Sequence, residues 1–178
     1  MVEQEAMRRR SVAFAMMKEV PLGIPGRIFG SPMPFSRYDP EGWLLKEFRK
    51  AGIELVVVLA EHEECLQKSG RDLIELYTRE GFGVIHVPTP DFSVPEDEDV
   101  EYALAAVEAA LRQGLNVAVH CGAGVGRTGL FLALLACRIL GLNAEDALRW
   151  VRRHYLPQAV EVGEQKLFLK RFCSRRSS

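Results

Sequence analysis

The chain has 178 residues and a formal net charge of −1, with 48% apolar and 26% charged residues. This length suits one domain with its own hydrophobic core, and the composition is not that of a disordered chain. The near-zero charge provides no basic field for nucleic acid, and no run of about 18 apolar residues predicts a membrane-spanning helix.

The first 20 residues are expected to form a helical extension. Arg8, Arg9 and Arg10 precede a short apolar run that ends at Lys18. This arrangement is similar to a signal peptide, but the run is at the lower limit of length and no small-residue cleavage site follows. A short amphipathic helix that covers the domain is the better interpretation, and we expect residues 21–178 to form one domain.

Strand and helix patterns alternate after a segment rich in proline and glycine at 21–40. Strands are predicted at 27–30, as a short edge strand, and at 53–59, 83–87 and 115–120. Helices are predicted at 43–50, 71–79, 97–113, 130–140, 143–154 and 164–172. The alternation predicts an α/β or closely related mixed α+β fold, with a central sheet of four or five strands flanked by helices.

A glycine-rich turn lies between the strand predicted at 115–120 and the apolar helix predicted at 130–140. Its glycines let the backbone curl so that successive N–H groups point inward, and the turn opens a helix whose N-terminus attracts anions. Arg127 can grip two oxygens of a phosphate. The same positive potential favours the thiolate form of Cys121, so the turn predicts a thiolate that faces a bound phosphate.

Three motifs compete for this turn. The dinucleotide fingerprint GxGxxG fits 124–129, but the acid that would accompany it, Asp146, falls at the start of a helix instead of the end of the next strand. A nucleotide P-loop needs glycine where Cys121 stands and lysine where Arg127 stands. The third pattern, His-Cys, five residues, Arg and Thr, fits at every position.

This third pattern resembles the catalytic loop of the cysteine-dependent protein tyrosine phosphatase superfamily, in particular its small dual-specificity-like members. A Pro-Asp-Phe segment at 90–92 stands thirty residues before Cys121, where those enzymes carry their acid loop. Residues 157–165 are similar to the segment after their second helix, and 26–32 to their opening strand. The resemblance covers about residues 24–172.

The resemblance implies a protein phosphatase that hydrolyses phosphotyrosine, and also phosphoserine or phosphothreonine, through a phosphocysteine intermediate. It implies Cys121 as the nucleophile, Asp91 as the general acid and then base, and Thr128 as a hydrogen-bond donor to Cys121. The groups expected to hold the phosphate belong to Gly122, Ala123, Gly124, Val125, Gly126 and Arg127. Chemistry of this kind requires no metal or cofactor.

Two further residues are expected to support the site. His120 would orient the loop through hydrogen bonds to backbone, without touching substrate, and Gln165 would position the water of the second step. Asp97 and Asp99 are alternative acids, although both suit the first turn of a helix through its dipole.

The expected substrate is a phosphorylated protein or peptide. Phosphoinositide-cleaving members of the superfamily typically carry lysines within the catalytic loop, and this loop has none, which favours a singly phosphorylated substrate. We expect a monomeric cytoplasmic enzyme that binds neither nucleic acid nor membrane. A phosphate-binding module without turnover and a rhodanese-like sulfurtransferase are the alternative hypotheses.

The four cysteines, at 65, 121, 137 and 173, show neither a CxxC pair nor metal-ligand spacing. We expect reduced thiols, with Cys137 inert inside the apolar helix. By the resemblance, Cys65 is the candidate for a reversible regulatory disulfide with Cys121. The charged residues 61–64 are interpreted as a solvated turn.

Overall fold

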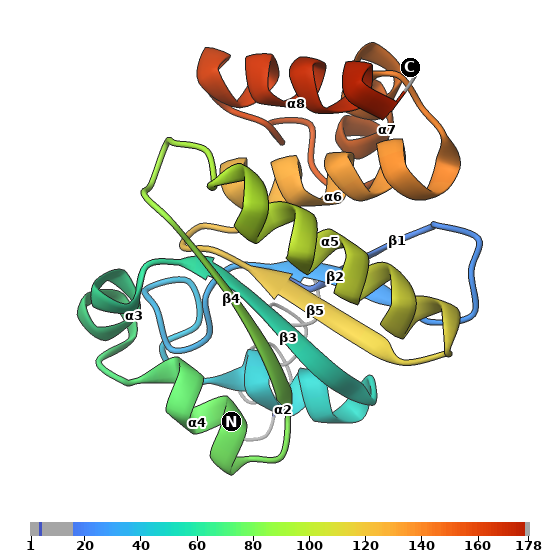
Figure 1. Cartoon of the computed structure of the whole chain (residues 1–178). Coiled ribbons are helices and arrows are strands. Elements are labelled where there is room, and N and C mark those ends of the chain that lie inside the picture. Colours follow the sequence, from blue (N-terminus) through green and yellow to red (C-terminus); the bar gives the residue numbers. More distant parts are fainter. Residues whose placement is uncertain (1–3, 5–15, 177–178) are drawn as a thin grey trace.

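Five strands form one mixed sheet at the centre of the computed structural model, which describes Gln4 and residues 16–176 (Figure 1). The strands are β1 (Lys18–Val20), β2 (Ile28–Ser31), β3 (Ile53–Ala60), β4 (Gly83–Thr89) and β5 (Asn116–His120). Their order is β1-β2-β5-β3-β4. β2, β5, β3 and β4 run parallel, whereas β1 pairs antiparallel with β2.

Helices cover both faces of the sheet (Figure 1). One face carries α2 (Trp43–Lys50), α3 (His62–Ser69) and α4 (Leu73–Arg79). The other carries α5 (Asp97–Arg112), α6 (Gly126–Leu140), α7 (Ala144–His154) and α8 (Gly163–Arg176). The fold is therefore the expected mixed α/β architecture, with the expected number of strands.

The sheet separates two apolar cores. Alternate residues of β3 point to opposite faces, so Val57 packs in the core under α5 and α6 while Val56 and Val58 pack in the core under α2 and α4. Because both faces are covered, the parallel strands are continuous apolar runs. α6 lies within the first core, where every residue from Gly126 to Cys137 is buried. This burial gives the loop before α6 a rigid support.

Within residues 16–176, no single helix is both long and apolar enough to cross a membrane. The bent pair of α6 and α7 meets the same criteria only when the two helices are joined.

Three predicted elements differ from the structure. The segment predicted as an edge strand is β2, which lies inside the sheet because β1 pairs along its outer side. Residues 18–20 form β1, so the helix expected over 1–20 does not include them. Most of the expected helix, residues 1–3 and 5–15, lies outside the described residues. Of the residues interpreted as a charged turn, 62–64 form the first turn of α3, and Glu61 precedes it. The acidic first turn suits the helix dipole, and Gly70, with φ 67°, follows the last residue of the helix.

The expectation of four reduced cysteines is wrong for one pair. Cys137 of α6 and Cys173 of α8 form a disulfide, with their Cα atoms 5.9 Å apart. They lie 36 residues apart in sequence, and only the packing of α8 against α6 brings them together. Cys65 and Cys121 are free and buried, so the candidate disulfide between them is not formed in this structure.

The disulfide predicts a stability that depends on redox state. Replacing both Cys137 and Cys173 by serine should lower the free energy of unfolding by about 3 kcal/mol, because the closed loop no longer restricts the unfolded chain. Dithiothreitol should lower the Tm of the wild type and leave that of the double variant unchanged in thermal unfolding. Thiol titration in denaturant should count two free thiols in the wild type, and a count of four would contradict the pairing.

Candidate active site

The candidate site lies where three parallel strands reach the same edge of the sheet. β5 ends at His120 and leads into the glycine-rich loop before α6. β4 ends at Thr89 and leads into the loop that carries Asp91, while β3 ends at Ala60 and leads into α3. Ligand sites of open α/β sheets occur at this edge, outside the carboxyl ends of the strands.

Two contacts fix the shape of the glycine-rich loop. The N–H of Met33 donates to the carbonyl of Gly122 at 2.9 Å, and the buried Tyr155 hydroxyl donates to the carbonyl of Gly124. Gly124 has φ 79°, and a side-chain carbon there would stand 2.6 Å from backbone atoms of Ser31 and Pro32. Only glycine fits at this position, because both the conformation and the space exclude a side chain.

His120 holds the start of the loop, in the place expected for it. Its Nδ1 lies 3.0 Å from the Cys121 carbonyl oxygen, and because a carbonyl only accepts, Nδ1 carries the proton. Nε2 therefore accepts from the Tyr77 hydroxyl at 2.8 Å. Burial is the main cause that lowers the pKa of His120 from 6.5 to about 4, so the ring is neutral near pH 7.

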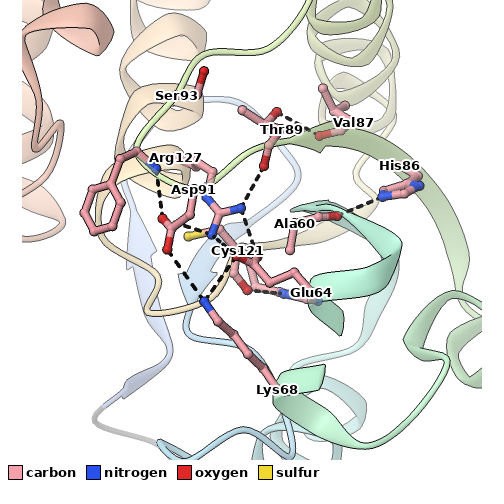
Figure 2. Close-up of polar contacts among 12 residues, drawn as sticks. Ala60, Glu64, Lys68, His86, Val87, Thr89, Asp91, Ser93, Cys121 and Arg127 are labelled. Carbon is pink, nitrogen blue, oxygen red and sulfur yellow. Dashed lines mark hydrogen bonds and ion pairs between the residues drawn. The ribbon is translucent and has the colours of Figure 1, made fainter. Parts of the chain in front are cut away.

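Arg127 lies deep in the site, with its side chain only 3% exposed. Nη1 donates to the Thr89 carbonyl at 2.8 Å, and the guanidinium meets both oxygens of Glu64, at 2.9 and 3.0 Å. Burial alone would lower the pKa of Arg127, but the hydrogen bond with Glu64 and the charges around it raise the pKa. Figure 2 shows the buried Cys121 sulfur beside this guanidinium.

Asp91 reaches the same guanidinium from the loop after β4. Its Oδ1 lies 3.2 Å from Arg127 Nη2 and accepts from the Phe92 N–H at 3.0 Å. Phe92 has φ 58°, an uncommon conformation for a residue with a side chain. The structure thus brings the expected acid, the expected nucleophile and the expected phosphate clamp together (Figure 2). In this state the Asp91 carboxylate is paired with the guanidinium that would bind a phosphate.

Gln165 ties the site to the C-terminal segment. Its side chain is buried, accepts from the Glu161 N–H at 3.0 Å and donates to the Ser93 carbonyl at 3.2 Å. A side-chain carbon on Gly126 would stand 3.1 Å from the Gln165 amide nitrogen. Gln165 therefore joins the acid loop to the segment before α8, beside the start of α6.

Two other candidate residues, Thr128 and Asp97, have surroundings that bear on their expected roles. The Thr128 hydroxyl is buried and has no hydrogen-bond partner among the described residues, so the expected bond to Cys121 is not made in this structure. Asp97, an alternative acid, pairs instead with Arg171 and Arg175 of α8, both at 2.9 Å. The hydrogen bond from Arg175 is the main cause that holds the pKa of Asp97 below its usual value.

Sequence reasoning missed Glu64 and Lys68. Lys68 Nζ lies 3.1 Å from Glu64 Oε1 and 3.6 Å from Asp91 Oδ2, so both residues of α3 belong to the site (Figure 2). Two signals could have found them: the segment follows the carboxyl end of a buried strand, and the spacing of Glu64 and Lys68 places both on one helix face. Across the described residues, no three His, Cys, Asp or Glu side chains gather as metal ligands.

The chain is similar to known proteins in sequence and in fold. The family model described as "Polymorphic toxin system, DSP-PTPase phosphatase" matches residues 39–140. An uncharacterized protein of Methanocaldococcus jannaschii is 34% identical over 93 residues, which are 52% of this chain and 60% of that protein. The chain thus spans less than two thirds of this curated relative.

Two solved structures have the same fold. Tk-PTP in its active form is 34% identical, with a TM-score of 0.73, over 90% of this chain and 97% of that one. Kinase associated phosphatase, with its catalytic-site cysteine replaced by serine, has a TM-score of 0.81 at 18% identity, over 91% of this chain and 96% of that one. The second likeness is one of fold alone.

The neutral state of His120 predicts a dependence of stability on pH. Because the pKa of His120 is lowered in the folded protein, the contribution of the neutral ring to stability is fully present above the unfolded pKa of about 6.5. This contribution is lost as pH falls toward 4. Between those pH values the free energy of unfolding should fall by about 3 kcal/mol more for the wild type than for His120→Asn, whose side chain keeps a hydrogen-bond donor but does not titrate. Urea unfolding from pH 7 to pH 4 measures both, and parallel curves would contradict the assignment.

Proposed function

The chain belongs to the DSP-PTPase phosphatase family, and from that membership we propose that it is a protein phosphatase acting on phosphotyrosine, and also on phosphoserine or phosphothreonine. The observation that carries the proposal is the convergence of Cys121, Arg127 and Asp91 at the start of α6 (Figure 2). These three groups provide a nucleophile, a phosphate clamp and an acid beside one loop.

The first step transfers the phosphoryl group to Cys121. The thiolate attacks phosphorus, an S–P bond forms, and the bond from phosphorus to the leaving oxygen breaks. The backbone N–H groups of 122–127 and the Arg127 guanidinium hold the equatorial oxygens, so stabilisation of charge on the transferring group is the largest contribution. Asp91 gives its proton to the leaving oxygen, and the product is a neutral alcohol or phenol.

Substrate binding requires an exchange of partners on Arg127. In the free protein the guanidinium faces two carboxylates, Glu64 and Asp91. Glu64 is more deeply placed, at 15% exposure against 43% for Asp91, so the incoming phosphate displaces Asp91. Glu64 stays and keeps the guanidinium oriented, while Asp91 is released to take up a proton and meet the leaving group.

The second step releases phosphate and restores the thiolate. Water attacks phosphorus, the S–P bond breaks, and Asp91 accepts the proton of the water. The Thr128 hydroxyl, which has no hydrogen-bond partner among residues 16–176 in the free protein, is available to donate to the departing thiolate. Gln165 holds the acid loop through Ser93 and so positions Asp91 for both proton transfers. For Gln165 to position the water, its amide would have to break its hydrogen bonds with Glu161 and Ser93.

Turnover of p-nitrophenyl phosphate and phenyl phosphate in EDTA tests these roles. Cys121→Ser should be inactive, because the nucleophile is lost. Asp91→Asn should lower kcat about 100-fold, with the greater loss on phenyl phosphate, whose leaving oxygen is the more basic. The pH profile of Asp91→Asn should lack the basic limb seen in the wild type.

Asp97→Asn is the matched control, since Asp97 is a nearby carboxylate that pairs with α8. It should keep wild-type turnover. Equal losses in the two asparagine variants would contradict the role of Asp91. A folded wild type that binds vanadate but hydrolyses neither ester would favour a binding module without turnover.

A further inference from the structure

Lys68 places a second cation at the rim of the glycine-rich loop. A side-chain carbon on Gly122 would stand 2.8 Å from Lys68 Nζ and 3.4 Å from Arg127 Nη2, so the two cations flank one point beside the loop. Gly122 directly follows Cys121 and leaves this space open. The loop has no lysine of its own, but α3 brings one to it from outside (Figure 2).

The two cations share two carboxylates. Glu64 and Asp91 each pair with Arg127, and each also pairs with Lys68, at 3.1 and 3.6 Å. The exposures of the cations differ: the Lys68 side chain is 42% exposed and that of Arg127 is 3% exposed. Arg127 is therefore the inner cation, within reach of the reacting phosphate, and Lys68 is the outer cation, open to the rest of a substrate.

The proposed reaction reduces the negative charge around Lys68. To act as an acid, Asp91 must carry a proton, and a protonated Asp91 no longer neutralises the ammonium. Lys68 makes a hydrogen bond to Glu64 at 3.1 Å, whereas Asp91 at 3.6 Å is beyond hydrogen-bond distance. The ammonium, with three N–H donors, can thus receive an anionic group that the substrate brings next to its phosphate.

We propose that Lys68 is a specificity-determining residue that binds a carboxylate next to the phosphorylated residue, so that phosphotyrosine peptides with an adjacent acidic side chain are preferred substrates. This inference rests on the proposed protein phosphatase activity. A carboxylate suits the site better than a second phosphate, because a dianion here would also face Glu64. The absence of lysine from the catalytic loop favoured a singly phosphorylated substrate, but that inference took account only of cations within the loop. Lys68 of α3 supplies a cation from outside it.

The test compares pairs of phosphotyrosine peptides that differ only in Asp against Asn next to the phosphotyrosine, on its N-terminal side in one pair and its C-terminal side in the other. The wild type should show a kcat/KM about three- to tenfold higher for the acidic peptide of at least one pair, as expected for a half-exposed charge pair. Lys68→Met removes the charge and keeps the apolar stem. It should bring this ratio to about one.

The ratio of kcat/KM between the two peptides of a pair reports recognition and not chemistry, because both peptides carry the same leaving group. Any effect of Lys68→Met on Asp91 changes both values alike and cancels in the ratio. Lys50→Met is the matched control: Lys50 also lies in the last turn of an eight-residue helix, 3.6 Å from Glu47 of the same helix. It should keep the wild-type ratio. Thermal unfolding of both variants checks that they are folded.

A second measurement does not depend on turnover. Fluorescence polarisation on Cys121→Ser and on Cys121→Ser with Lys68→Met should show the same preference in Kd, lost in the double variant. Equal use of all peptides by the wild type, or a preference that survives Lys68→Met, overturns the role of Lys68 and leaves the phosphatase activity standing. A wild type that hydrolyses none of the peptides overturns the proposed function and this inference together.

Discussion

The site depends on a buried guanidinium that must be paired at every stage. Arg127 is 3% exposed, and a buried cation without a partner is strongly destabilising. Glu64 and the Thr89 carbonyl meet this need from the inner side, and Asp91 meets it from the outer side. In the proposed mechanism the outer partner is the one that a phosphate dianion replaces. The need to pair this cation would then stabilise the free protein, provide the binding place for phosphate and release Asp91 when substrate binds.

The rest of the fold brings these charges together. Parallel pairing of β3, β4 and β5 brings three loops to one edge of the sheet, and each loop contributes to the cluster. The buried helix α6 anchors the loop that carries Cys121, while Tyr155 and the neutral His120 fix its backbone. The Cys137–Cys173 disulfide holds α8, and with it Gln165, against this helix. Apolar packing thus provides the precision that the charges require.

The sequence predicted the parts of the site that are local. The loop after β5 could be interpreted because its cysteine, glycines and arginine act over a few neighbouring residues. Asp91 followed from the resemblance of residues 90–92, after a strand, to the acid loop of the phosphatase superfamily. Glu64 and Lys68 were missed because a charged run on a short helix has the same composition as a solvated turn, and only strand order shows that it faces Arg127. The Cys137–Cys173 pair was missed because it depends on how α8 docks on α6. β1 was missed because its three residues carry no strand pattern of their own.

A crystal structure with vanadate bound would test the exchange of partners on Arg127 most directly. The account predicts vanadium bonded to the Cys121 sulfur, two oxyanion oxygens on the Arg127 guanidinium, Glu64 still paired with Arg127, and Asp91 moved from the guanidinium toward the apical oxygen. Vanadate bound in the loop with Asp91 still paired to Arg127, or with Glu64 displaced in its place, would contradict it.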